Sequence, residues 1–158
     1  MSGSQGLFYK NKVKPEIAVY IETNYPDFFE QVLKLAGEEP ASGSVAAAWS
    51  SGFATSGNPG ADLITIGAED VRYKVHSLLV SIVNLSPGAS IEVRLYQELN
   101  GVEHEVYNQS FVPGTDPDGL WIINGTVSIH QELRVELYSN DPADDGAAVD
   151  YDYMLEAM

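Results

Sequence analysis

The stretch Val71–Val112, VRYKVHSLLVSIVNLSPGASIEVRLYQELNGVEHEVYNQSFV, decides the fold of this 158-residue chain. Apolar and polar residues alternate along it, with breaks at Ser86-Pro87-Gly88 and at Asn100-Gly101. Asn-Gly between two alternating runs predicts a type I′ hairpin turn, because both central residues of that turn need a positive φ. We therefore expect three consecutive antiparallel strands, with Asn100-Gly101 joining the second to the third.

The turn also predicts a register. If Leu99 lies opposite Val102, then Leu95 lies opposite Val106, while Tyr96 faces Glu105 and Arg94 faces Tyr107. One face of the hairpin is then polar and aromatic, and the other carries an apolar set: Ile91, Val93, Leu95, Leu99 and Val106. A half-buried antiparallel sheet has this division between its faces.

Further strands are predicted on both sides of this stretch, at Asp62–Ala68, Leu133–Tyr138 and Val149–Leu155. The run Val71–Leu85 changes phase, which indicates either a bulge near Ser77 or burial of both faces in its second half. A second Asn-Gly at Asn124-Gly125 predicts either another tight hairpin or one bulged strand.

The whole pattern amounts to seven or eight short strands with turn residues roughly every eight to twelve positions. That pattern predicts an all-β fold, an antiparallel β-sandwich of jelly-roll or immunoglobulin-like type. We expect the sandwich to occupy residues 61–158.

Residues 1–60 are expected to form an N-terminal arm. Asn24-Tyr25-Pro26-Asp27 has the features of a helix start, and apolar residues then recur at three- and four-residue spacing until Gly37, which predicts one short helix. From Pro40 to Ala61 the chain is rich in Gly, Ser and Ala, as in a linker or an extended arm. Trp49 and Phe53 argue for anchoring, because isolated large aromatic residues are rarely left fully solvated.

The chain is strongly acidic, with a formal net charge of −15 and a pI near 4.2. Such a surface repels phosphate backbones and anionic lipid, so we expect neither nucleic acid nor membrane as a partner. Residues 1–60 hold four Lys and six acids, whereas residues 61–158 hold four bases and seventeen acids. The asymmetry indicates either plain solubility or a basic arm that docks on an acidic body, including that of a neighbouring copy.

Motifs for catalysis are not apparent. The chain has no Cys, no Gly-x-Ser-x-Gly and no phosphate-binding glycine loop, and His76, His104 and His130 are isolated from one another in sequence. We expect no enzymatic activity and no resident cofactor. Calcium is the alternative, because two acidic loops could supply oxygen ligands: Asp116 and Asp118 in PGTDPDG, and Asp141, Asp144 and Asp145 in SNDPADDG. Asp-Pro and Asp-Gly are also ordinary turn chemistry.

Aromatic and basic residues suggest how the chain binds its partners. Tyrosine is favoured in strands and at protein interfaces, and it also stacks on sugars. The residues expected at a partner interface are Lys10, Lys12, Lys14, Phe28, Phe29, Trp49, Phe53, Tyr96 and Tyr107. Trp121 stands close after Asp116 and Asp118, and it joins the acidic loops as a candidate ligand site.

The segments KVHSLLVSIVNL–SIEVRLYQELNG, TDPDGLWIINGT and VDYDYMLEAM resemble structural proteins of tailed-phage virions, notably capsid decoration (cement) proteins and related head or tail components. The resemblance covers residues 62–158 and implies a homo-oligomer on a virus particle, bound to a capsid or tail protein, with the arm lacing neighbouring subunits together. The expected location is the virion, with synthesis in the host cytoplasm, since no secretory signal is visible. A carbohydrate-binding module or receptor-binding adhesin is the alternative function.

Overall fold

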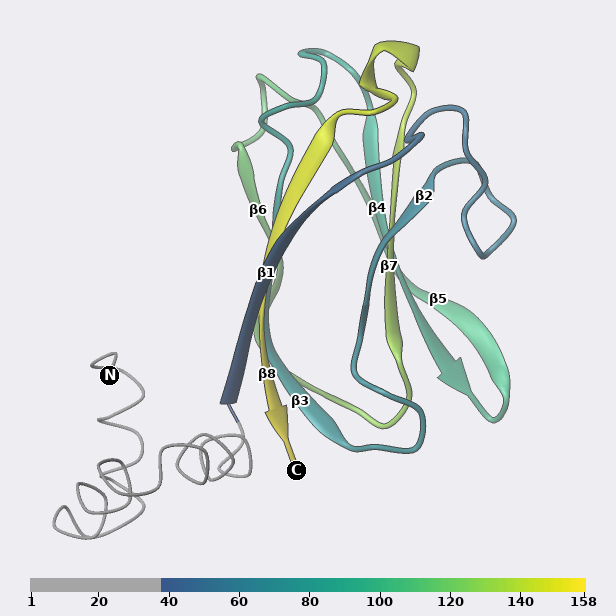
Figure 1. Cartoon of the computed structure of the whole chain (residues 1–158), viewed down its shortest axis with the longest axis vertical. Coiled ribbons are helices and arrows are strands. Elements are labelled where there is room, and N and C mark those ends of the chain that lie inside the picture. The colour runs from purple at the N-terminus through teal and green to yellow at the C-terminus, as the bar shows by residue number, and fades with distance from the viewer. Residues whose placement is uncertain (1–37) are drawn as a thin grey trace, which may run out of the picture.

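The computed structural model describes residues 38–158, which form eight strands and one short 3-10 helix, η1 (Figure 1). The strands are β1 (Glu38–Ala46), β2 (Ala61–Ile66), β3 (Tyr73–Ser81), β4 (Ile91–Leu99), β5 (Val102–Phe111), β6 (Gly119–Ile129), β7 (Leu133–Ser139) and β8 (Ala148–Ala157). The helix η1 spans Pro142–Asp144. The all-β prediction is confirmed.

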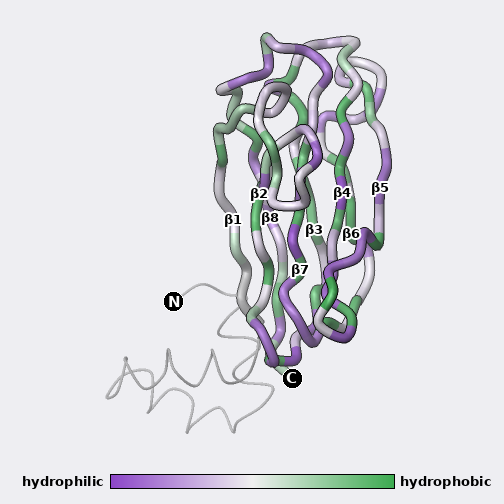
Figure 2. Tube along the Cα trace, turned by 90° about the vertical axis from the view of Figure 1, so that its right-hand side faces the viewer, coloured by the Kyte–Doolittle hydropathy of each residue, from purple (hydrophilic) through white to green (hydrophobic). Residues whose placement is uncertain are grey.

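The strands form two four-stranded antiparallel sheets, in the orders β1-β8-β3-β6 and β2-β7-β4-β5. The two sheets pack face to face in a sandwich-like arrangement, called here the two-sheet body. Its core takes side chains from both sheets, with Val75, Leu78 and Val80 on one and Val93, Val135 and Leu137 on the other, all fully buried. Figure 2 shows the apolar and polar residues interleaved along the strands, as burial of one face requires.

The Asn100-Gly101 hairpin is confirmed. Asn100 has φ 53° and Gly101 has φ 79°, the two positive values that a type I′ turn needs. Leu99 pairs with Val102 and Tyr96 with Glu105, as predicted. Beyond that point the predicted register is wrong, because a bulge pairs Leu95 with Tyr107 and Arg94 with Asn108.

Val106 is the extra residue of this bulge. The shift turns the half-buried Tyr107 ring against the core and leaves Val106 52% exposed. A tyrosine ring offers more apolar area to bury than a valine side chain does, which favours the bulged register.

The three consecutive strands are present, but only the second and third, β4 and β5, pair with each other. β3 pairs with β6 and β8, whereas β4 lies in the other sheet between β5 and β7. The segment around Pro87-Gly88 therefore crosses from one sheet to the other. This crossing buries Val75 and Val80 of β3 in the same core as Val93 of β4.

The two predicted irregularities lie in neighbouring strands. His76 is skipped in both pairings of β3, which confirms the bulge expected near Ser77. Asn124-Gly125 lies inside the single strand β6, so the bulged strand is right and the second tight hairpin is wrong. Gly125 has φ 139°, a conformation that side chains rarely tolerate.

The boundary expected at residue 60 is wrong for residues 38–60. β1 pairs with the last strand, β8, along its whole length, and the Trp49 side chain is fully buried in the core. The small residues of this segment permit close packing: a Cβ on Gly43 would lie 2.6 Å from the Tyr151 hydroxyl oxygen. The predicted helix and the rest of residues 1–37 lie outside the described residues.

Candidate functional site

The acidic loop 139–146 holds one end of the two-sheet body together. Asp144 is 1% exposed, and its carboxylate accepts hydrogen bonds from the Ser86 backbone N–H and hydroxyl, both at 2.7 Å, and from the Ser139 hydroxyl. Ser86 belongs to the β3–β4 loop. The side chain thus links two loops, and both of its carboxylate oxygens accept hydrogen bonds from the protein.

Asp145 makes a similar link to the β1–β2 loop. Its carboxylate accepts hydrogen bonds from the Ser50 backbone N–H at 2.7 Å and from the Ser50 hydroxyl at 2.9 Å. The Ser50 backbone bond is the main cause of a lowered pKa for Asp145, because it favours the charged form. Asp141 caps η1 by accepting from the Ala143 N–H.

The other acidic loop serves its own turn. Asp116 accepts a hydrogen bond from the Val112 N–H at 2.7 Å. The side chain of Asp118 is exposed, and its backbone carbonyl accepts a hydrogen bond from the Ile82 N–H. The topology places both acidic loops at the same end of the body (Figure 1). Within residues 38–158, no three His, Asp or Glu side chains gather closely enough to hold a metal ion.

The aromatic residues predicted at a partner interface have different locations. Trp49 is a core residue whose indole N–H donates to the Ala147 carbonyl, so its assignment to an interface is wrong. Tyr96 is only 6% exposed, and its hydroxyl contacts Asn58 and Glu105, so it is not an open contact residue either. Phe53 is 77% exposed in the β1–β2 loop, and Tyr107 is half-buried. Lys10, Lys12, Lys14, Phe28 and Phe29 lie outside the described residues.

A charged network that the sequence did not predict lies on the outer face of the β2-β7-β4-β5 sheet. Glu136 is fully buried there, between Arg94, whose Nη1 is 3.2 Å from Glu136 Oε1, and Arg134. Arg134 also contacts Asp62, at 2.7 Å, and Glu103. Desolvation alone would lower the pKa of Arg134, but its hydrogen bonds to Glu103 and Glu136 outweigh that effect and raise it.

The β1–β2 loop covers this network. Ser56 donates from its hydroxyl to Glu136 at 2.9 Å, and the Pro59 carbonyl accepts from Arg94 Nη2 at 2.9 Å. The paired charges therefore fasten a loop onto a sheet. The charged side chains of this network therefore stabilise the two-sheet body, because they hydrogen-bond to one another and to the loop.

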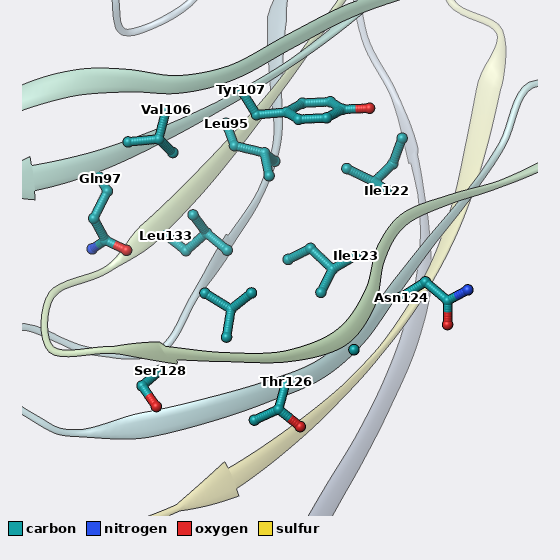
Figure 3. Close-up of a pocket in the computed structure, with 12 residues that line it drawn as sticks. Leu95, Gln97, Val106, Tyr107, Ile122, Ile123, Asn124, Thr126, Ser128 and Leu133 are labelled. Carbon is teal, nitrogen blue, oxygen red and sulfur yellow. The ribbon is translucent and has the colours of Figure 1, made fainter.

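A cavity of about 610 Å³ opens between the β4–β5 hairpin and β6 (Figure 3). Leu95, Ile123 and Leu133 form its apolar wall, while Gln97, Asn124 and Thr126 add polar groups. β5 and β6 are the edge strands of the two sheets, and Figure 2 shows them on the same side of the body. The cavity thus lies where the two sheets part.

A second cavity of about 440 Å³ lies between the tip of the same hairpin and the β6–β7 turn, sharing Gln97 and Ser128 with the first. We call the two together the edge groove. Its lining includes three exposed apolar side chains: Leu99 at 58%, Val106 at 52% and Val127 at 44%. Exposed apolar residues gathered around one concavity are typical of binding surfaces.

The bulges of β3 and β6 create one further arrangement. His76 Nδ1 lies 2.9 Å from the Thr126 hydroxyl, and its Nε2 lies 2.6 Å from a Glu156 carboxylate oxygen. These three residues belong to three adjacent strands and are far apart in sequence. A hydroxyl, an imidazole and a carboxylate in this order can relay a proton. The phase change near Ser77 was the one sequence feature that pointed to this location.

No protein-family model matches the chain, and no curated protein matches it either. Among residues 38–158, no helix has the length and apolar content to cross a membrane.

Proposed function

We propose that the two-sheet body is a jelly roll. The strands pair from the ends of the described chain inward: β1 with β8, β2 with β7, β3 with β6 and β4 with β5. That nested pairing corresponds to one long antiparallel hairpin wrapped into two sheets, as in an eight-stranded jelly roll. The immunoglobulin-like alternative pairs more neighbouring strands, whereas β4 and β5 are the consecutive strands that pair within residues 38–158.

We propose that the protein is a non-enzymatic structural component of a virus particle, of the capsid decoration type or a related head or tail component. The edge groove carries this proposal. Its larger cavity has an apolar wall, it is bordered by two edge strands, and it has room for several side chains of a partner protein. Jelly rolls occur in viral capsid proteins, which is a fold-level analogy that favours the same conclusion.

Protein partners fit this surface better than charged ligands do. The acidic loops use most of their carboxylates in internal hydrogen bonds, and Arg94 and Arg134 are committed to internal ion pairs. Exposed apolar side chains and unpaired strand edges remain to make contact. A partner segment can place side chains in the groove and add backbone hydrogen bonds along β5 or β6. The partners are then other copies of the chain and a capsid or tail protein.

The test compares two exposed valines at opposite ends of the body. Val127 lines the edge groove, and Val83, 54% exposed, lies in the β3–β4 loop. The full-length tagged chain and its Val127→Glu and Val83→Glu variants are expressed during infection, and the particles are banded on a density gradient. We expect the wild type and Val83→Glu to band with particles. The amount of Val127→Glu that bands with particles should be at least tenfold lower.

Immunogold images of the banded particles then locate the chain on head or tail, and light scattering gives its oligomeric state. A chain that stays monomeric and never bands with particles contradicts the proposal. Equal incorporation of the two glutamate variants contradicts the role of the groove.

Carbohydrate binding is the second candidate function, and Trp121 favours it. This side chain is 58% exposed on β6, between the buried residues Leu120 and Ile122, and so faces outward from its sheet. An exposed indole on an open sheet face can stack on a sugar ring, and lectin domains also use the jelly roll. A glycan array probed with and without calcium tests it. Binding that is lost in Trp121→Ala and kept in Phe53→Ala, a second exposed aromatic, supports this alternative.

A further inference from the structure

We propose that residues 25–37 of the same chain cover the edge groove, with Phe28 and Phe29 as the side chains that enter it. This inference goes beyond the proposed function, because it concerns how the protein closes its own apolar surface before it meets any partner. It rests on the position of the groove, the reach of the chain and the charge of the body.

One row of paired residues across the β1-β8-β3-β6 sheet connects the start of β1 to the groove. Glu38 pairs with Glu156, Glu156 with Lys74, and Lys74 with Ser128, which lines the groove. The row crosses three strand spacings, a distance of about 14 Å at about 4.8 Å each. The chain that precedes Glu38 therefore leaves the two-sheet body close to the end of the groove.

The segment before Glu38 is long enough to cross this distance. Nine positions separate Phe29 from Glu38 in the sequence. They span about 14 Å as a helix and about 30 Å when extended. In either conformation Phe29 can reach the groove from its own chain.

The composition of the segment matches the groove. Phe28, Phe29, Val32, Leu33 and Leu35 recur at the spacing of one helical face. Leu99, Val106 and Val127 offer the exposed apolar surface that such a face needs. A tether this short also gives the segment an effective concentration of about millimolar, so the copy on the same chain outcompetes one from a neighbour.

Charge favours the same association. Residues 1–37 contain four of the eight basic residues and four of the 23 acids, and the first fifteen residues contain three Lys and no acid. The body holds the remaining nineteen acids, and two of its four bases are committed to internal ion pairs. Residues 1–37 therefore carry no net formal charge, and the three lysines of the first fifteen residues are drawn toward the acidic body.

The natural absence of cysteine makes a direct test available. Full-length double variants carry Phe29→Cys with either Val127→Cys, in the groove, or Val83→Cys, in the β3–β4 loop, and each is treated with a short bismaleimide at low protein concentration. We expect an internal cross-link in the monomer for the Val127 pair, at a yield at least tenfold above the Val83 pair. A third pair, Phe29→Cys with Val106→Cys, gives the same answer if Val127→Cys disturbs the fold.

Equal yields for the two positions, or no cross-link to either Val127 or Val106, overturn the proposal. Cross-linked dimers in place of monomers also overturn it, because they identify a second copy as the occupant. The purified chain suffices for this experiment. A protein that never joins virus particles can still show the internal cross-link, so failure of the proposed function and failure of this inference are distinguishable.

Discussion

The indole N–H of Trp49 donates to the carbonyl of Ala147 at 2.7 Å, although 98 positions separate the two residues in the sequence. The ring itself is fully buried in the core. Nearby, the Ser139 N–H donates to the Trp49 carbonyl and the Gly146 N–H to that of Ala47. One side chain and two backbone bonds thus fasten the first described loop to the last.

Replacing Trp49 tests the importance of this contact. Trp49→Ala removes a buried ring and leaves a cavity, so we expect the free energy of unfolding to fall by about 3–5 kcal/mol. Trp49→Phe keeps most of the packing and loses the hydrogen bond, at a cost of about 1–2 kcal/mol. Urea unfolding measures both. Phe53→Ala, at a 77% exposed position, is the control, and an equal loss there contradicts the prediction.

Glu136 is the second test, because two guanidinium groups depend on its carboxylate. Glu136→Ala leaves Arg94 and Arg134 buried with part of their charge uncompensated, and we expect a loss of about 3–5 kcal/mol in the free energy of unfolding. Glu132 is exposed and immediately precedes β7. Glu132→Ala should change the free energy of unfolding by no more than about 0.5 kcal/mol. If the two variants lose the same free energy of unfolding, the prediction of a specific contribution from the network is contradicted.

Acid should weaken the link made by Asp145. Its pKa is lowered in the folded protein, chiefly by the Ser50 backbone hydrogen bond, so its contribution is present above the unfolded pKa and is lost as the pH falls through the folded one. We expect the stability difference between wild type and Asp145→Asn to be constant above about pH 5 and to shrink below about pH 4. Thermal unfolding of both proteins at about five pH values from pH 3 to pH 7 measures this difference. Asp150→Asn, on an exposed part of β8, corrects for the lost charge; a difference that grows toward low pH has the wrong sign.

Calcium should leave the protein unchanged. The Asp144 oxygens accept from Ser86 and Ser139, and Asp145 accepts from Ser50, so a cation would have to displace these donors. We expect the Tm to move by less than about 1 °C between millimolar calcium and a chelator, because a ligand stabilises only in proportion to its binding. A Tm that climbs steadily with calcium concentration would instead identify these loops as a metal site.

Local sequence patterns predicted local structure well. Asn100-Gly101 fixed a hairpin, and the phase change near Ser77 marked a bulge, since both depend on residues within one or two turns of the chain. The alternation from Val149 to Leu155 predicted a strand, and on β8 Val149 and Leu155 are buried while Asp150 and Asp152 are exposed.

Which strands pair across the fold could not be predicted in the same way. Alternation says that β3 has a buried face, but it does not say whether β4 or β8 lies beside it. The strand Leu133–Tyr138 was predicted, but Ser56 of the β1–β2 loop, which covers Glu136, comes 80 positions earlier in the sequence. The edge groove was missed for the same reason, because β4, β5, β6 and β7 each contribute a part of it.

The pairing of β1 with β8 has a consequence for how the protein is made. The ribosome releases β1 long before its partner, so Glu38–Ala46 must wait until Ala148–Ala157 has left the exit tunnel. Until then β8 is missing from between β1 and β3. The complete sheet can therefore form only after Ala148–Ala157 has been translated, and nascent chains stalled short of Ala148 should be easily degraded by proteases.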